Sequence, residues 1–132
     1  MGNRTVFDTN IWISYFLNEN FSELIQPRRE YGVLFLRSLS SLSELKEVIK
    51  RKKFKSKNFN ITKLIDFYSG ISEFCDTKPL FKDCLDPKDN FLFDLAIQGK
   101  ANYLVSGDKK VLETQLERKT IEITTLSAFK KS

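Results

Sequence analysis

The chain has 132 residues, a hydrophobic content of 41% and a net charge of +5, and we expect one domain over residues 1–132. It contains no histidine, which excludes Ser-His-Asp and Cys-His nucleophile pairs, imidazole acid–base catalysis and histidine-ligated zinc. Carboxylates, lysines, hydroxyls and metal ions remain for any catalysis.

The first half of the chain predicts strands and helices in alternation. Strands are predicted at 5–7 and 33–36, and helices at 11–17, 43–51 and 62–73. Asn10 is available to cap the first helix, and Ser41 or Ser43 the second. The polar stretch 18–32 is expected to be a connection, with a helical turn that ends at Pro27.

The second half carries sharper signals. Asp-Pro, an apolar run and then Gly99 predict a helix over 87–98, with Asp86 as N-cap and the glycine just past the end. Further elements are an extended piece at Phe74, strands at 103–105 and 121–124, and a helix at 109–116. Strands alternating with helices predict an α/β fold whose parallel sheet is covered on both faces.

The cysteines and the N-terminus carry no zinc or targeting signal. Cys75 and Cys84 lack paired C-x-x-C spacing, so we expect them to be reduced and structural. The start MGNRTVFD has no apolar signal region, and Val6 stands where a myristoylation signal needs Ser or Thr. No stretch approaches the ~18 apolar residues of a membrane span. We expect a cytoplasmic protein.

The positive charge is concentrated in one stretch. Residues 46–63 hold eight Lys or Arg against one acid, with Phe54 and Phe59 among them. Basic side chains with interleaved aromatics suit a phosphate backbone and unstacked bases, although a solvated helix face is an equal alternative. The candidate RNA contacts are Lys50, Arg51, Lys52, Lys53, Lys55 and Lys57.

Four acids follow or flank apolar runs: Asp8, Glu44, Asp89 and Asp108. Asp8 and Asp108 come directly after predicted strands, where an open α/β sheet presents its ligand site. Carboxylates gathered there repel one another by ~4 kcal/mol per close pair at an effective dielectric constant near 20. Such a cluster usually implies a divalent cation.

Each acid also has a structural interpretation. Asp8 and Asp108 can cap the helices that follow them, and Asp-Pro-x-Asp places Asp86 and Asp89 where the helix dipole favours acids. We expect Asp86 to be a cap and Asp89 a ligand. Asp94, flanked by apolar residues, is expected on the open side of its helix or in contact with a Lys or Arg.

Three segments together carry a family resemblance: VFDTNIWISYFL, SELKEVIKRKKF and CLDPKDNFLFDLAIQGKANYLVSGDKKVL. They resemble the PIN domain, especially the bacterial (VapC-like) branch of toxins from toxin-antitoxin pairs, over nearly the whole chain. D-T-N alone is a weak signal, but its coincidence with D-P-K-D and S-G-D-K-K-V-L is specific. The resemblance implies a three-layer α/β/α sandwich around a parallel sheet of four to five strands, and a metal-dependent endoribonuclease.

The family pattern assigns roles to individual residues. Catalytic acids by this pattern are Asp8, Glu44, Asp89 and Asp108. Ligands of one or two Mg²⁺ or Mn²⁺ ions would be Asp8, Asp89 and Asp108. Residues that order the site would be Thr9, Asn10, Asp86 and Ser106. Glu47, one turn from Glu44 on the same predicted helix, is the alternative second acid, and Glu44 would then be an ordinary surface glutamate.

The implied chemistry is attack by metal-activated water on an RNA phosphodiester. The absence of histidine disfavours a route through the ribose 2′-hydroxyl, which usually needs a general base with a pKa near neutrality. The implied partners are RNA, a small antitoxin and a second copy of the chain, with no membrane. Candidate surfaces for these protein partners, or else core residues, are Phe54, Phe59, Phe67 and Tyr68.

Other classes explain the sequence less well. A haloacid-dehalogenase-like phosphatase needs D-x-D after its first strand, and position 10 is Asn. A PIN-like RNA-binding module without catalysis, and a structure-specific DNA nuclease, remain open alternatives.

Overall fold

Five parallel strands form one sheet in the order β3-β2-β1-β4-β5. The computed structural model describes residues 3–17, 32–52, 60–116 and 120–131. The strands are β1 (Asn3–Phe7), β2 (Val33–Arg37), β3 (Ser72–Phe74), β4 (Tyr103–Val105) and β5 (Glu122–Thr124). All four neighbouring pairs run parallel, which confirms the predicted α/β fold with a parallel sheet of four to five strands.

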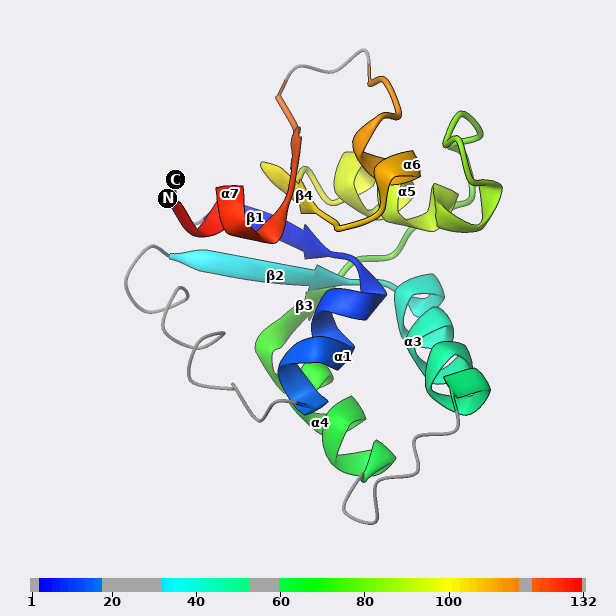
Figure 1. Cartoon of the computed structure of the whole chain (residues 1–132), viewed down its shortest axis with the longest axis vertical. Helices are drawn as coiled ribbons and strands as arrows, with labels where there is room; N and C mark the ends of the chain where they lie inside the picture. The colour runs from blue at the N-terminus through cyan, green and yellow to red at the C-terminus, as the bar shows by residue number, and fades with distance from the viewer. Residues whose placement is uncertain (1–2, 18–31, 53–59, 117–119, 132) are drawn as a thin grey trace.

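Helices cover both faces of this sheet (Figure 1). They are α1 (Thr9–Leu17), α3 (Leu39–Lys52), α4 (Ile61–Ile71), the 3-10 helix η1 (Pro87–Asp89), α5 (Asn90–Gln98), α6 (Lys109–Leu112) and α7 (Leu126–Lys131). Successive strand residues point to opposite faces. Phe7, Phe35 and Val105 therefore pack with side chains of α1, α3, α4 and α7, whereas Val6, Leu36 and Leu104 pack with those of α5 and α6.

The strand order reverses at β1. The chain builds β2 and β3 on one side of β1 and then returns to build β4 and β5 on the other. In open α/β sheets ligands bind beyond the carboxyl ends of the strands at such a switch point. Asp8 follows β1, and the segment from Ser106 to Asp108 follows β4. The topology therefore brings these residues together beyond the carboxyl ends of the neighbouring strands β1 and β4.

Two helices begin earlier than predicted. α1 begins at Thr9, so Asn10 lies inside its first turn, and the carbonyl of Asp8 accepts the N–H of Ile11 at 3.0 Å. α3 begins at Leu39 because Ser38 and Ser41 form a capping box. The N–H of each serine donates to the Oγ of the other, at 2.8 Å and 3.1 Å. Ser38 is therefore the N-cap residue of α3, and Ser41, at the third helical position, accepts the N–H of Ser38 in return.

The helix predicted over 87–98 is two helices, with η1 preceding α5. Its end also differs, because Gly99 has a right-handed φ of −81° and Lys100 takes the left-handed φ of 55°. The N–H of Ala101 donates to the carbonyl of Ala96 at 2.8 Å, which is the Schellman pattern. Gly99 is needed for close packing, since a Cβ there would lie 2.6 Å from the carbonyl oxygen of Leu95.

The remaining differences are at the ends of elements. α4 is shorter than predicted because β3 begins at Ser72, which places Phe74 in the expected extended piece. α6 ends at Leu112 instead of 116, and α7 was not predicted. The predicted turn before Pro27 lies outside the described residues. Both cysteines are free, and no helix among the described residues is long and apolar enough to cross a membrane.

Candidate active site

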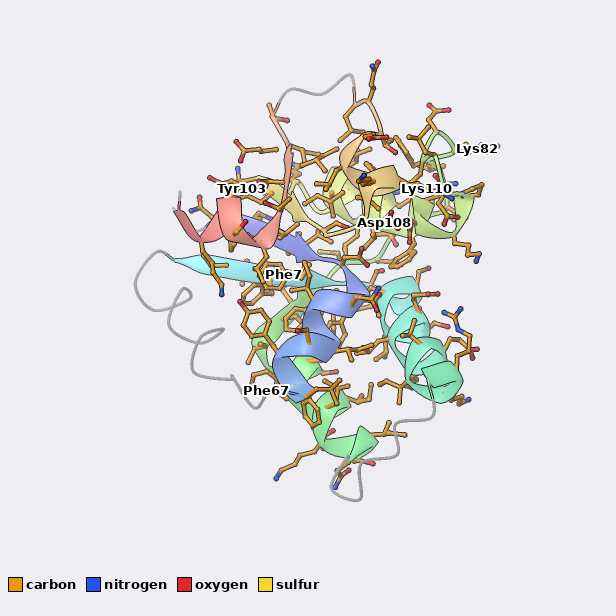
Figure 2. All side chains as sticks on the ribbon, in the orientation of Figure 1. Phe7, Phe67, Lys82, Tyr103, Asp108 and Lys110 are labelled. Atoms are coloured by element: carbon orange, nitrogen blue, oxygen red, sulfur yellow. The ribbon has the colours of Figure 1, made fainter. Side chains whose placement is uncertain are left out.

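Five carboxylates from four parts of the chain line one cavity of about 300 Å³ at the carboxyl edge of the sheet. The acids that line it are Asp8, Glu44, Asp86, Asp89 and Asp108, and the other lining residues are Thr9, Asn10, Val48, Arg51 and Lys88. Figure 2 shows Asp108 at the end of the sheet where α1 and α3 begin. The four acids proposed from sequence therefore lie together, and Asp86 lies with them.

Asp8 is the most buried of these acids, with 7% of its surface exposed. Ser106 Oγ donates to Asp8 Oδ2 at 2.7 Å and accepts the N–H of Asp108 at 3.0 Å. Burial raises the pKa of Asp8, while the Ser106 hydroxyl and the backbone N–H groups of Thr9 and Asn10 oppose that rise. Ser106 thus joins the ends of β1 and β4, and Thr9 and Asn10 act on Asp8 through their backbones.

Asp86, Asp89 and Asp108 form a tight triplet whose carboxylate oxygens lie within 4.8 Å of one another. Asp86 is the N-cap of η1 and Asp89 its last residue, and the N–H of Asp89 donates to the carbonyl of Asp86 at 2.9 Å, which closes the turn between the two acids. Asp86 and Asp108 are also helix caps, accepting the N–H of Lys88 at 3.2 Å and of Lys110 at 2.9 Å. Asp86 and Asp108 therefore cap helices and also belong to the carboxylate triplet.

Asp89 experiences the strongest electrostatic penalty of the cluster. Burial first, and then the negative charges of Asp8, Asp86, Asp108 and Glu44, raise its pKa to about 7. Oxygen ligands of this kind are those that hard divalent cations prefer. A bound cation would offset the repulsion that the raised pKa reports, so the residues present fit a divalent metal ion.

Glu44 is half-buried at the cavity wall and forms an ion pair with Arg51, with 3.4 Å between Oε1 and Nη2. Glu47 is exposed and is not among the residues that line the cavity. Of the predicted RNA contacts that the structure describes, Arg51 lines the cavity, and Lys50, next to it in the sequence, is exposed. The other predicted RNA contacts, Lys52 through its side chain and Lys53, Lys55 and Lys57 entirely, fall outside what the structure describes.

Sequence reasoning missed the place of Lys88, which lies between two acids of η1 and lines the cavity. The sequence predicts Asp86 among the residues that order the site but not among the metal ligands. The Asp-Pro-x-Asp spacing is a usable signal for its place in the triplet, since it puts the two acids at the N-cap and the third residue of one helical turn.

The expected position of Asp94 was wrong. It is 5% exposed, and its Oδ1 accepts the N–H of Leu80 at 3.0 Å, the N–H of Phe81 at 2.7 Å and Gln98 Nε2 at 3.2 Å. The loop 77–82 packs against the face of α5 that carries Asp94, so the carboxylate accepts two backbone N–H groups and the Gln98 amide.

The proposed aromatic partner surface is also corrected at Tyr68. This residue is 2% exposed and belongs to the core beneath α1, where its ring lies 5.0 Å from that of Trp12. Phe67 is half-buried and packs against the same core. Phe54 and Phe59 lie outside the described residues.

The family model described as the PIN domain matches residues 4–110. The chain belongs to the PIN domain family. All five acids of the cavity lie within the matched residues, and PIN domains are generally metal-dependent nucleases, which supports a nuclease that uses divalent cations.

A similar protein is "Uncharacterized protein MJ1680" of Methanocaldococcus jannaschii, which is 26% identical over 132 residues. The similarity covers 93% of this chain and 82% of that protein, whose name states no activity. No solved structure matches the chain.

Proposed function

We propose that this PIN domain is an endoribonuclease that uses Mg²⁺ or Mn²⁺ to cleave single-stranded or structured RNA, and that it is the toxin of a toxin-antitoxin pair. The observation that carries the nuclease assignment is the carboxylate triplet within 4.8 Å at the edge of the sheet, with buried Asp8 beside it. The family match supports the same activity.

The residues that would hold the metal are Asp8, Asp89 and Asp108, with Asp86 as a further candidate from its place in the triplet. A divalent cation bound there would polarise the scissile phosphate and lower the pKa of the attacking water. The Ser106 hydroxyl fixes the orientation of the Asp8 carboxylate at 2.7 Å. Arg51 and Lys88 are cations at the same cavity and would hold the phosphates of the substrate.

The preference for RNA rests on the basic stretch 46–63 and on the family resemblance. Arg51 connects that stretch to the cavity, where its guanidinium forms an ion pair with Glu44. The toxin assignment rests on the resemblance alone. It predicts a neighbouring gene for a small DNA-binding antitoxin, and a complex of the two proteins, in addition to a homodimer.

The test is a comparison of single-stranded RNA, single-stranded DNA and flap DNA as substrates with Mn²⁺ and with EDTA. We expect Mn²⁺-dependent cleavage of RNA that leaves a 5′-phosphate and a 3′-hydroxyl, also where the nucleotide at the cut carries a 2′-deoxyribose. Asp89→Asn should abolish cleavage, whereas Asp66→Asn, an exposed acid of α4 away from the cavity, should not.

The other results identify the alternatives. Preferential cleavage of flap DNA would assign a structure-specific DNA nuclease. RNA binding without cleavage of any substrate would assign a non-catalytic RNA-binding module. A 2′,3′-cyclic phosphate product, or full activity in excess EDTA, would contradict the metal-dependent mechanism.

A further inference from the structure

A second cavity, of about 360 Å³, lies next to the carboxylate cavity and has no role in the chemistry described above. Its lining includes Ser40, Lys78, Phe81, Lys82, Asn90 and Phe91. We propose that it binds one base of a single-stranded nucleic acid, at a nucleotide beside the scissile phosphate. This inference rests on the proposed nuclease function and names how the substrate is positioned.

The two cavities are lined by different residues of the same two elements, α3 and the turn at η1. At η1, the N-cap Asp86 and Lys88 line the first cavity, and Pro87, between them, lines the second. On α3, Glu44 lines the first cavity, and Ser40, four residues earlier on the same helix face, lines the second. A polynucleotide strand that crosses the carboxylates between α3 and η1 would therefore reach the second cavity with its next nucleotides.

The chemistry of the second cavity suits a base with its phosphate. Phe81 and Phe91 are half-buried and offer aromatic surface, on which bases of any sequence can stack. Lys78 and Lys82 are exposed at the same cavity and supply positive charge for the adjoining phosphates. Figure 2 shows Lys82 on the same side of the molecule as Asp108 and Lys110. The volume is in the range of small-ligand sites, about 300–1,000 Å³.

The loop 77–82 that forms this cavity is fixed before any ligand arrives. Asp94 binds the N–H groups of Leu80 and Phe81. Gln98 binds both the N–H and the carbonyl of Lys78, at 2.8 Å and 2.7 Å. The ring of Phe81 stacks on Phe93 with 4.6 Å between centroids. Asp94 is thus a positioning residue, and a site ordered in advance loses less entropy on binding.

A protein segment is the competing occupant, because Leu39 and Leu80 beside the cavity are 69% and 66% exposed. The base is favoured by the neighbouring lining positions on α3 and at η1 and by the two lysines, since a strand that crosses the carboxylates would bring its next phosphates to Lys78 and Lys82. A peptide has no such reason to lie across the carboxylates.

The test uses a single-stranded RNA oligonucleotide and its DNA counterpart, in each of which one base at a time is replaced by an abasic site. Dissociation constants are measured with the full chain carrying Asp8→Asn, so that binding is read without cleavage. We expect one abasic position next to the cut to weaken binding about tenfold, the size of one stacked base. The RNA and DNA arms show which sugar the site accepts.

Phe91→Leu in the same background removes the aromatic face but keeps an apolar side chain against the core. It should weaken binding of the intact oligonucleotide about tenfold and abolish the further effect of the sensitive abasic position. Lys82→Gln should lower the salt dependence of binding by the contribution of about one phosphate. Lys100→Gln, at the opposite end of α5, lines neither cavity and should leave it unchanged.

A flat abasic scan together with an unchanged dissociation constant for Phe91→Leu would overturn the inference and leave the cavity to a protein partner. If the wild-type chain still cleaves RNA with Mn²⁺ in that case, the proposed nuclease function stands without this site. If the wild-type chain cleaves nothing, the nuclease proposal fails by itself, and the scan then reports only on binding.

Discussion

At the scale of single residues, Asp89 is the acid of the cavity whose pKa is raised furthest above its ordinary value. Its side chain makes no capping hydrogen bond, and its pKa is raised to about 7 by burial and by four neighbouring acids. Asp86 and Asp108 differ, because a backbone N–H donates to each of their carboxylates. A backbone hydrogen bond therefore partly offsets the negative charge of Asp86 and of Asp108, whereas no capping hydrogen bond offsets that of Asp89.

The raised pKa predicts how the metal-free protein responds to pH. The unfolded chain releases the Asp89 proton near the ordinary pKa of about 3.9, whereas the folded chain keeps it up to about pH 7. Between these values the native state binds more protons, so stability falls as pH rises and the loss is complete above pH 7. Asp8, whose pKa is also raised, acts in the same direction.

We therefore expect Asp89→Asn to be more stable than the wild-type chain at pH 8 and about equal to it at pH 4. Solvent screening of this half-buried group keeps the difference on the order of 1 kcal/mol. Urea unfolding in EDTA across this pH range measures it, and Asp66→Asn, at an exposed position of α4, is the control. An Asp89→Asn variant with the same pH dependence as the wild-type chain would contradict the raised pKa.

The sequence located individual acids better than it located their partners. Asp8 and Asp108 follow recognisable strands, so their meeting at the sheet edge is predictable from topology. Asp94 is different, because its three donors come from Gln98 and from a loop without regular secondary structure. Nothing in the pattern near position 94 shows that a loop folds back over it, so its burial could not be predicted.

At the scale of elements, the sequence predicts which segments are strands and helices, but their ends depend on contacts made in the fold. α3 starts at Leu39 because Ser38 and Ser41 cap each other's N–H groups, a reciprocal pair that propensity does not reveal. α5 ends with a left-handed lysine because its C-cap is Gly99, so the left-handed position of the Schellman pattern falls on Lys100, while Gly99 lies where a Cβ would meet Leu36 and Leu95.

Two glycines test this interpretation in opposite directions. A Cβ at Gly99 would lie 2.6 Å from Leu95 O and 2.9 Å from Leu36 Cδ1, so Gly99→Ala should destabilise the fold by about 1–3 kcal/mol. A Cβ at Gly70, inside α4, meets nothing within 4 Å, so Gly70→Ala should stabilise it by about 0.5–1 kcal/mol. Urea unfolding of both variants measures the difference. Equal effects at the two positions would mean that Gly99 is not a packing glycine.

At the scale of the whole molecule, a positively charged chain carries a site made of acids. The net charge is +5, and the basic stretch 46–63 reaches the carboxylate cavity at Arg51. The positive charge of that stretch attracts a polyanion, while the local negative cluster would repel a phosphate unless cations neutralise it. Substitutions in the basic stretch should therefore weaken binding of nucleic acid, and substitutions of the acids should weaken binding of metal, each with little effect on the other.

The salt dependence of RNA binding tests the first half of that statement. Each phosphate neutralised on a single strand contributes about −0.7 to the slope of log affinity against log salt. Replacing Arg51, Lys52, Lys53 and Lys55 with Gln should make the slope shallower by up to about 2.8. Mn²⁺ affinity, measured by titration, should change little. An unchanged slope would identify the basic stretch as a solvated surface without a role in binding.

Metal binding tests the second half. If the acids hold Mn²⁺ only in the folded chain, a free concentration one hundred times the dissociation constant should stabilise the fold by about 2.7 kcal/mol. Thermal melting with and without Mn²⁺ measures this shift. Asp89→Asn should remove most of it, because this carboxylate lies within reach of all the other acids. Asp66→Asn should retain all of it.

Asp86→Asn is the decisive variant, because Asp86 is both a helix cap and a member of the triplet. Asn caps a helix about as well as Asp, so a residue that only caps would leave metal-free stability, Mn²⁺ affinity and cleavage close to wild type. A residue that also helps to hold the cation should raise the Mn²⁺ dissociation constant by about tenfold or more, while the metal-free chain melts at the same temperature or higher. We expect the second result, since the three carboxylates lie within 4.8 Å and removing one charge relieves their repulsion. Unchanged Mn²⁺ affinity in Asp86→Asn would return this residue to a purely structural role and leave Asp8, Asp89 and Asp108 as the ligand set.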